Sequence, residues 1–258
     1  MQARAVEARR GWQWILDGFG LFRKNPVIWV ALTIVLGLMW LLSFIIPVLG
    51  PLLFNLLSPV FFAGVLIGCR ALEQGEELGV PHLFAGFRQH AAPLVTVGGV
   101  YLIGTIIVFG IVFMVAGGSM VLASISKPGV DPATVAAAVR SLALALAVGA
   151  AVYIPLLMLI WFAPALVVFK NLAPVAAMKL SFEACRMNVV PFLVYSLGIL
   201  GLWFVLSLPA GLGRFGMAIG IALLVVSLPV LFCSVYASYK DVFADRTATA
   251  RGDVPLPR

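Results

Sequence analysis

The side chains that could perform acid/base catalysis are grouped in one short segment of the sequence. Glu73, Glu76 and Glu77 are followed closely by His82 and His90. General acid/base catalysis needs a carboxyl or imidazole group held within reach of the proton it moves, and no spacing in this segment singles out such a pair. The histidines form no His-Glu-x-x-His motif and lie beside no paired cysteines. We therefore expect a charged loop here, with no catalytic or metal-binding residue and no cofactor.

Three arginines recur in one short motif and are the candidate lipid-headgroup contacts. Arg23, Arg88 and Arg186 each follow the pattern Phe-x-x-(Phe/Cys) and precede x-(Asn/His). A guanidinium group binds phosphate oxygens through paired hydrogen bonds, and basic side chains at a bilayer surface attract anionic headgroups. Anchoring by side chains that extend toward the interface is the simpler interpretation. Specific headgroup recognition is the alternative.

The strongest candidate for a polar site at membrane depth is Asn55 with Ser58, which lie in a long apolar tract. A hydrogen bond between helices is the favoured interpretation of Asn55, and contact with a substrate is the alternative. The predicted membrane-spanning segments contain no ionisable Asp, Glu, Lys, Arg or His side chain. Proton or ion coupling normally requires such groups at membrane depth, so neither is predicted.

The composition places most of these residues in a membrane protein. Of the 258 residues, 63% are hydrophobic and only 10% are charged, whereas soluble domains carry roughly a quarter charged residues. Five tracts lack Asp, Glu, Lys and Arg, and one of them has two prolines and a glycine between residues 47 and 51, which favour a turn between two helices. At roughly 20 residues for each crossing, the tracts predict six transmembrane helices, at about 26–46, 51–69, 93–117, 141–168, 190–208 and 215–238.

The distribution of basic residues predicts the orientation. Fourteen of the 17 lysines and arginines fall on the side of the N-terminus, and the other three, Lys127, Arg140 and Arg214, fall opposite. Because basic loops are retained in the cytoplasm, both termini are expected there, in a multi-pass protein of a bacterial inner membrane. The net charge of +7 is spread along one bilayer face, so membrane lipids, and no nucleic acid, are the expected partners.

The arginine motif marks a threefold internal repeat, with units at about 8–70, 80–170 and 174–243. Apolar residues at 12, 15, 19 and 22 recur at 175, 178, 182 and 185 with the spacing of one helical stripe, which predicts amphipathic helices in the membrane interface. Each motif precedes a pair of predicted spans, so the fold class is an all-α integral membrane domain, residues 1–243, of three parallel helical hairpins. A long outer loop at 119–140 and a disordered cytoplasmic tail at 244–258 complete the prediction.

Small residues recur near the ends of the first and third units. Gly64 and Gly68 match Ser234 and Ser238, and each pair is spaced by four residues. Such pairs allow helices to approach closely in lipid. Parallel repeats predict a pseudo-threefold axis along the membrane normal, unlike the in-plane twofold axis of inverted repeats.

Several segments carry a family resemblance: Gly-Trp-Gln-Trp at 11–14, the run from Gly to Asn-Pro at 18–26, Leu-Phe-Ala-Gly-Phe-Arg at 83–88, and Tyr-x-x-Tyr-Lys-Asp-Val-Phe at 236–243. Together they resemble an uncharacterised family of proteobacterial, mainly betaproteobacterial, multi-pass inner-membrane proteins over nearly the whole chain. A more distant likeness, to the membrane domains that accompany bacterial glycerophosphodiester phosphodiesterases, implies a lipid-linked setting. The chain lacks the catalytic domain of those enzymes, and the likeness implies no active-site residue.

These observations predict a non-enzymatic integral membrane protein with a lipid-associated or membrane-organising role. The alternative is a transporter or channel for a neutral or lipid-like solute, built around the axis of the three hairpins. A membrane enzyme would require its acidic groups and His82 to converge at the cytoplasmic face.

Overall fold

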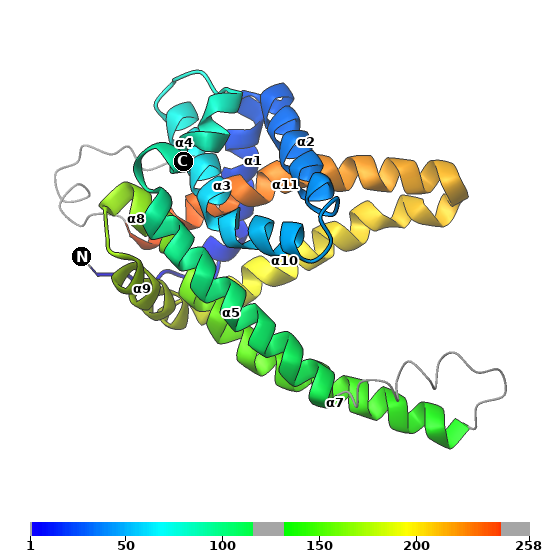
Figure 1. The fold of residues 1–258 in the computed structure, drawn as a ribbon. Helices are drawn as coiled ribbons and strands as arrows, with labels where there is room; N and C mark the ends of the chain where they lie inside the picture. Colours follow the sequence, from blue (N-terminus) through cyan, green and yellow to red (C-terminus); the bar gives the residue numbers. More distant parts are fainter. Residues whose placement is uncertain (1, 116–131, 244–258) are drawn as a thin grey trace.

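The computed structural model describes residues 2–115 and 132–243, and these residues contain helices and connecting segments but no β-strand (Figure 1). The all-α prediction is confirmed for this part of the chain. The elements are α1 (Arg10–Lys24), α2 (Pro26–Ser43), α3 (Leu49–Glu73), η1 (Val80–Phe84), α4 (Ala85–Gln89), α5 (Ala91–Val115), α7 (Pro132–Ile160), α8 (Ala163–Lys170), α9 (Pro174–Met187), α10 (Val189–Ser207), η2 (Leu208–Leu212) and α11 (Gly213–Val242).

The boundary between α1 and α2 shows how the sequence ends one helix and begins the next. Asn25 leaves the helical conformation, and its side-chain oxygen accepts a hydrogen bond from the backbone N–H of Ile28 at 3.4 Å. Pro26 occupies the first turn of α2, where its missing N–H costs nothing. Asn25 and Pro26 therefore end α1 and begin α2.

The middle unit differs from its prediction in two places. Its interfacial helix is reduced to the 3-10 helix η1 and the five-residue α4, because a helix as long as α1 would have Pro81 in its interior, where proline breaks an α-helix. The span expected at 141–168 is divided into α7 and α8 at Trp161 and Phe162, just before Pro164. Of the loop expected at 119–140, residues 132–140 are helical, and residues 116–131 lie outside the described residues, as does the tail at 244–258.

Five segments are long and apolar enough to cross a membrane: Pro26–Ser43, Leu49–Glu73, Ala91–Val115, Val135–Lys170 and Val189–Val242. The last has 54 residues, and one straight helix of that length would extend about 80 Å, far beyond the hydrocarbon thickness of roughly 30 Å. It is instead α10, η2 and α11, and the chain reverses at Gly213, whose φ is +77°.

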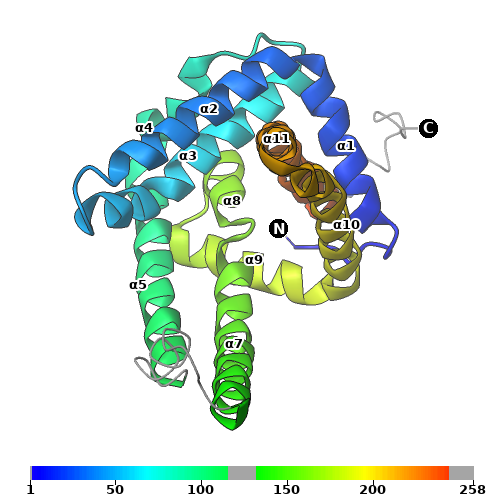
Figure 2. The same cartoon turned by 90° about the vertical axis from the view of Figure 1, so that its right-hand side faces the viewer.

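Consecutive long helices lie beside each other as α2 with α3, α5 with α7, and α10 with α11 (Figures 1 and 2). The short helices link these pairs into a ring, since α3 packs against η1 and α4, α7 against α9, and α11 against α1. Along the long helices, α3 packs on α5 and α11 on α2, whereas α7 and α10 barely touch. In Figure 1 the α5 and α7 pair diverges from the α10 and α11 pair.

Glycines allow the closest of these contacts. A Cβ atom on Gly11 of α1 would lie 2.0 Å from the carbonyl oxygen of Pro191, and one on Gly18 would lie 2.6 Å from the backbone nitrogen of Ser234. A Cβ on Gly64 would lie 2.3 Å from the carbonyl oxygen of Leu83. Two of the small residues noted in the sequence, Gly64 and Ser234, therefore lie where the end of one helix pair meets the next short helix.

Candidate functional site

The three motif arginines occupy equivalent places in the helices. Arg23, Arg88 and Arg186 lie in the last turns of α1, α4 and α9, and all three side chains are exposed. None of them has a hydrogen bond or ion pair with another described residue, although the Arg23 guanidinium stacks at 5.8 Å from the ring centroid of Phe19. Their positive charges are therefore not neutralised by a carboxylate within the described part of the molecule.

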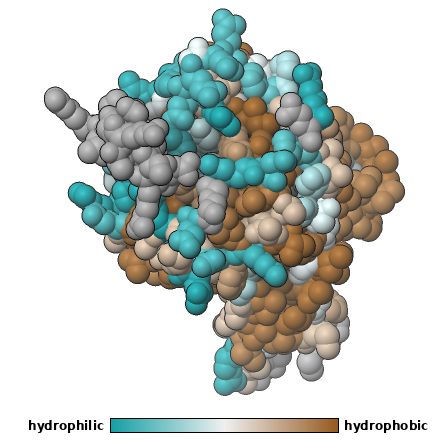
Figure 3. Space-filling model, turned by 90° about the vertical axis from the view of Figure 1, so that its left-hand side faces the viewer, coloured by the Kyte–Doolittle hydropathy of each residue, from teal (hydrophilic) through white to brown (hydrophobic). Residues whose placement is uncertain are grey.

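The last residue of each motif marks a break between helices. Asn25, His90 and Asn188 each follow a short helix, and α2, α5 and α10 begin at the next residue. The arginine therefore always lies three residues before the first residue of a long apolar helix. Hydrophilic side chains gather on the face that carries both ends of the described chain, whereas the projecting helices have an apolar surface (Figure 3).

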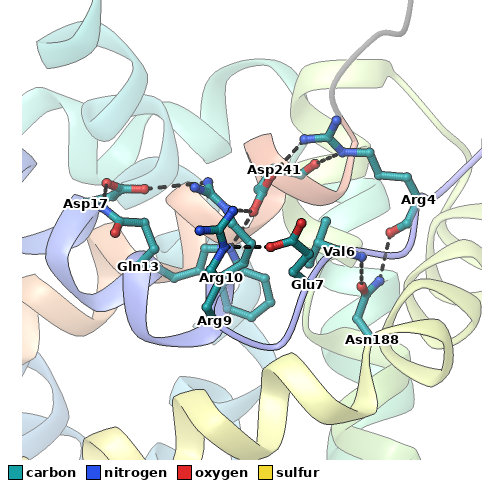
Figure 4. A network of polar contacts seen from close by, with 10 residues as sticks. Arg4, Val6, Glu7, Arg9, Arg10, Gln13, Asp17, Asn188 and Asp241 are labelled. Carbon is teal, nitrogen blue, oxygen red and sulfur yellow. Dashed lines mark hydrogen bonds and ion pairs between the residues drawn. The ribbon is translucent and has the colours of Figure 1, made fainter. Parts of the chain in front are cut away.

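A network around Asp241, near the end of α11, is the densest polar cluster of the described residues (Figure 4). The Arg4 guanidinium donates to Oδ1 at 2.8 Å, and Oδ2 accepts from Arg10 Nε at 2.6 Å and from the Trp14 indole N–H at 2.9 Å. The Asp241 side chain is only 7% exposed. Two cations and one indole N–H stabilise its buried negative charge. This network fastens residue 4 and α1 to the end of α11.

Asn188 holds the same N-terminal segment from a second side. Its Oδ1 accepts a hydrogen bond from the backbone N–H of Val6 at 2.8 Å, and its Nδ2 donates to the carbonyl oxygens of Arg4 and Ala184 at 2.9 and 2.8 Å. The Asn188 side chain is fully buried, so its amide group depends on these bonds for its hydrogen-bond partners. Asn188, the motif asparagine of the third unit, thus joins the N-terminal segment to the end of α9. Asn25, the motif asparagine of the first unit, instead caps the N-terminus of α2.

The acidic segment does not form a hydrogen-bonded cluster. Glu73 accepts from the Tyr236 hydroxyl at 2.8 Å and forms an ion pair with Lys240, both on α11. Glu76 and Glu77 are exposed, and the Nδ1 atom of His82 lies 3.2 Å from the backbone N–H of Gly79. No group of three or more His, Cys, Asp or Glu residues in the described ranges is placed to hold a metal ion.

Asn55 and Ser58 have separate surroundings. Ser58 donates to the backbone carbonyl oxygen of Asn55 at 2.7 Å and lines a cavity. The side-chain oxygen of Asn55 is buried without a hydrogen-bond partner, and Asn55 does not line that cavity. The two residues are therefore joined only by the hydrogen bond from the Ser58 hydroxyl group to the backbone carbonyl oxygen of Asn55, within α3.

The cavity has a volume of about 900 Å³ and lies between all three pairs of long helices. Most of its walls are hydrocarbon or aromatic side chains. They include Leu36 and Trp40 of α2, Phe54 and Phe62 of α3, Leu157 and Ile160 of α7, Ile199 and Leu200 of α10, and Leu228 and Phe232 of α11. Helix periodicity alone could not reveal this space, because these side chains belong to the same apolar tracts as those that face lipid.

Over almost its whole length this chain is similar to a known protein. A "Probable inner membrane protein" of Burkholderia thailandensis is 31% identical over 260 residues, which cover 94% of this chain and 94% of the relative. The chain belongs to that protein's family. The inner-membrane family and the five apolar segments together identify a multi-pass inner-membrane protein. No family model and no solved structure matches the chain, and none of the comparisons shows the likeness to the domains that accompany glycerophosphodiester phosphodiesterases.

Proposed function

We propose that this inner-membrane protein is a non-enzymatic, lipid-associated protein whose cytoplasmic face binds anionic headgroups through Arg23, Arg88 and Arg186. The observation that supports this proposal is that all three guanidinium groups are exposed, lack a carboxylate partner among the described residues, and lie three residues before the start of a long apolar helix. That position corresponds to headgroup depth if the following helices enter the bilayer. A guanidinium group there can bind a lipid phosphate through paired hydrogen bonds.

The proposed architecture has six transmembrane helices, paired as α2 with α3, α5 with α7, and α10 with α11. Dividing the 54-residue apolar segment at η2 supports the count of six, and the ring of contacts between each pair and the next short helix supports three equivalent units. The short helices α1, α4 and α9 then lie in one interface. The excess of basic residues on that side supports a cytoplasmic location for this interface and for both termini.

The enrichment of anionic lipid around the protein in nanodiscs tests the role of the arginines. Protein reconstituted in nanodiscs of phosphatidylcholine with a minority of phosphatidylglycerol should enrich the anionic lipid around itself, and the triple replacement of Arg23, Arg88 and Arg186 by Gln should abolish most of that enrichment. Replacement of Arg140 and Arg214 by Gln is the matched control, because both are exposed and lie on the opposite side in the proposed topology. Equal enrichment by the wild type and the triple variant would remove the proposed headgroup contact.

A second candidate function is the passage of a lipid-like solute through the membrane domain. The cavity between the helix pairs favours it, because a transporter of this kind needs a space near its central axis. Its largely apolar walls favour a hydrophobic solute over a polar one. Transfer of a fluorescent lipid between the leaflets of proteoliposomes, at a rate above that of protein-free vesicles, is the expected result for this alternative.

A further inference from the structure

We propose that the cavity between the three helix pairs is a binding site for an acyl chain of a bilayer phospholipid, which enters from the side between α7 and α10. The proposal rests on the proposed membrane-spanning arrangement of the long helices, and does not depend on the headgroup contacts of the arginines. It assigns a ligand class and an entry path to the interior of the molecule.

The chemistry of the walls favours a hydrocarbon ligand. The hydroxyl groups of Thr33 and Ser58 bond to backbone carbonyl oxygens of their own helices, at 2.9 and 2.7 Å. The Tyr195 hydroxyl bonds to Ser234 and the Tyr101 hydroxyl to Tyr153, at 2.7 and 2.8 Å. A polar solute in this cavity would lose its hydrogen bonds to water and find few free partners, which is unfavourable.

The size of the cavity makes an empty state unfavourable. A volume of about 900 Å³ is at the upper end of small-molecule sites, roughly 300 to 1,000 Å³, and far exceeds the gaps normally left in packed interiors. Apolar cavities do not fill readily with water, and an empty one forfeits the dispersion contacts of its walls. A flexible hydrocarbon chain restores those contacts without requiring a polar partner.

The entry path follows from the contacts between helix pairs. α3 packs on α5 and α11 packs on α2, so two of the three junctions between pairs are closed by helix contact. At the third, α7 and α10 barely touch, yet Leu157 of α7 and Ile199 of α10 both line the cavity. The ring contacts of Trp161 with Phe192 and Tyr195, at centroid distances of 5.4 and 6.1 Å, close this junction at one end. Beyond these rings, where α7 and α10 diverge, the proposed arrangement exposes the cavity to the acyl chains of the bilayer.

The bilayer that surrounds the protein favours a lipid over a second protein molecule as the occupant of the cavity. A side opening in a membrane-spanning protein is bathed in acyl chains, and a ligand present in such excess occupies even a weak site. A helix of a second copy would instead have to displace those chains and find a complementary surface. The lipid chain is therefore the occupant that the observations favour.

Photo-crosslinking tests the proposal on the full chain. The protein is reconstituted with phosphatidylcholine that carries a diazirine at the middle of one acyl chain, and the crosslinked peptides are identified by mass spectrometry. We expect crosslinks at cavity residues such as Leu157 and Ile199. In the variant Gly37→Phe these crosslinks should fall several-fold, because Gly37 lines the cavity and open space surrounds the position of an added Cβ. Ser196→Phe, which fills the cavity from α10, should act in the same way.

Gly110→Phe is the matched control, since Gly110 also has open space around its Cβ position but does not line the cavity. It should leave the cavity crosslinks unchanged. Crosslinks found only on outward-facing residues, cavity crosslinks that are equal in all variants, or a protein crosslink that places a second copy in the cavity would each overturn the proposal. Phosphatidylcholine has no net charge, so a failure of the arginine contacts would leave this result unaffected and would appear only in the phosphatidylglycerol experiment.

Discussion

Two regions of this molecule are held together in opposite ways. The base, which comprises residues 2–25, α9, and residues 230–242 of α11, is joined by the Asp241 network and by glycine contacts between backbones. The arms, which are the projecting parts of the α5 and α7 pair and of the α10 and α11 pair, expose large apolar side chains such as Phe109 and Phe215. The comparison indicates that protein contacts fix the base, whereas the bilayer must surround and support the arms.

The largest expected effect is in the base, at Asp241. Replacing Asp241 by Ala leaves Arg4, Arg10 and the Trp14 indole without their shared acceptor. The loss of one member of a buried ion pair lowers the free energy of unfolding by about 3 kcal/mol. The measurement is unfolding in mixed micelles with sodium dodecyl sulfate, followed by a thiol-reactive dye. All three cysteines are buried, so the dye reports opening of the fold.

Glu7→Ala is the control for this prediction, because Glu7 pairs with Arg9 and both side chains are largely exposed. An exposed pair contributes less than about 1 kcal/mol. Equal destabilisation by the two substitutions would show that the Asp241 network does not hold the base.

The second effect in size is expected where α1 crosses α10. An added Cβ at Gly11 meets the backbone of Pro191 at 2.0 Å, and backbone atoms cannot move aside as a side chain can. Gly11→Ala should therefore cost about 2 kcal/mol, within the range for overpacked sites. In the arms, Gly110→Ala should be neutral or slightly stabilising, because the position is open and alanine favours a helix. Similar losses of stability in both variants would contradict the proposed difference between base and arms.

The smallest effects concern one tyrosine hydroxyl in each region. Tyr195→Phe removes a buried hydrogen bond to Ser234 near the base and should cost about 1 kcal/mol. Tyr101→Phe removes a bond to Tyr153 between α5 and α7 and should cost about 0.6 kcal/mol, a typical value for polar contacts between membrane helices. The same titration in mixed micelles compares the two variants. A larger loss of stability in Tyr101→Phe than in Tyr195→Phe would contradict the expectation that protein contacts contribute more in the base than in the arms.

Local sequence rules predicted the ends of helices better than their assembly. The boundary at Asn25 and Pro26 follows from side-chain capping and the ring of proline. The shortened interfacial segment at η1 and α4 was not predicted, because the Phe-x-x-Phe-Arg motif recurs there while Pro81 prevents a continuous helix. A motif can therefore be repeated even where the helix that carries it is not.

The Asp241 network could not be predicted from pattern alone. Arg4 and Arg10 look like ordinary cytoplasmic charges, and they reach Asp241 across more than 200 residues of sequence. A usable signal existed, because Asp241 is the only acidic residue from Met187 to Phe243. A carboxylate at the end of a long apolar segment requires a cationic partner, yet only the fold shows which cations provide it.

For the candidate sites too, the sequence predicted one part and only the fold shows the other. The repeated motif drew attention to Arg23, Arg88 and Arg186, and the structure adds that they are exposed and have no carboxylate partner within residues 2–115 and 132–243. The cavity remained hidden because Leu157 and Ile199 are as apolar as any lipid-facing residue. Only the divergence of α7 from α10 distinguishes a cavity wall from an outer surface.

The central claim is that the three arginines share one cytoplasmic face, and its most direct test is cysteine accessibility. Arg23→Cys, Arg88→Cys and Arg186→Cys are made singly in a chain whose own cysteines, Cys69, Cys185 and Cys233, are replaced by Ala. A membrane-impermeant maleimide is then applied to inside-out and right-side-out vesicles. We predict that all three positions react in inside-out vesicles and none in right-side-out vesicles. Labelling of any one of them from the opposite side would contradict the account.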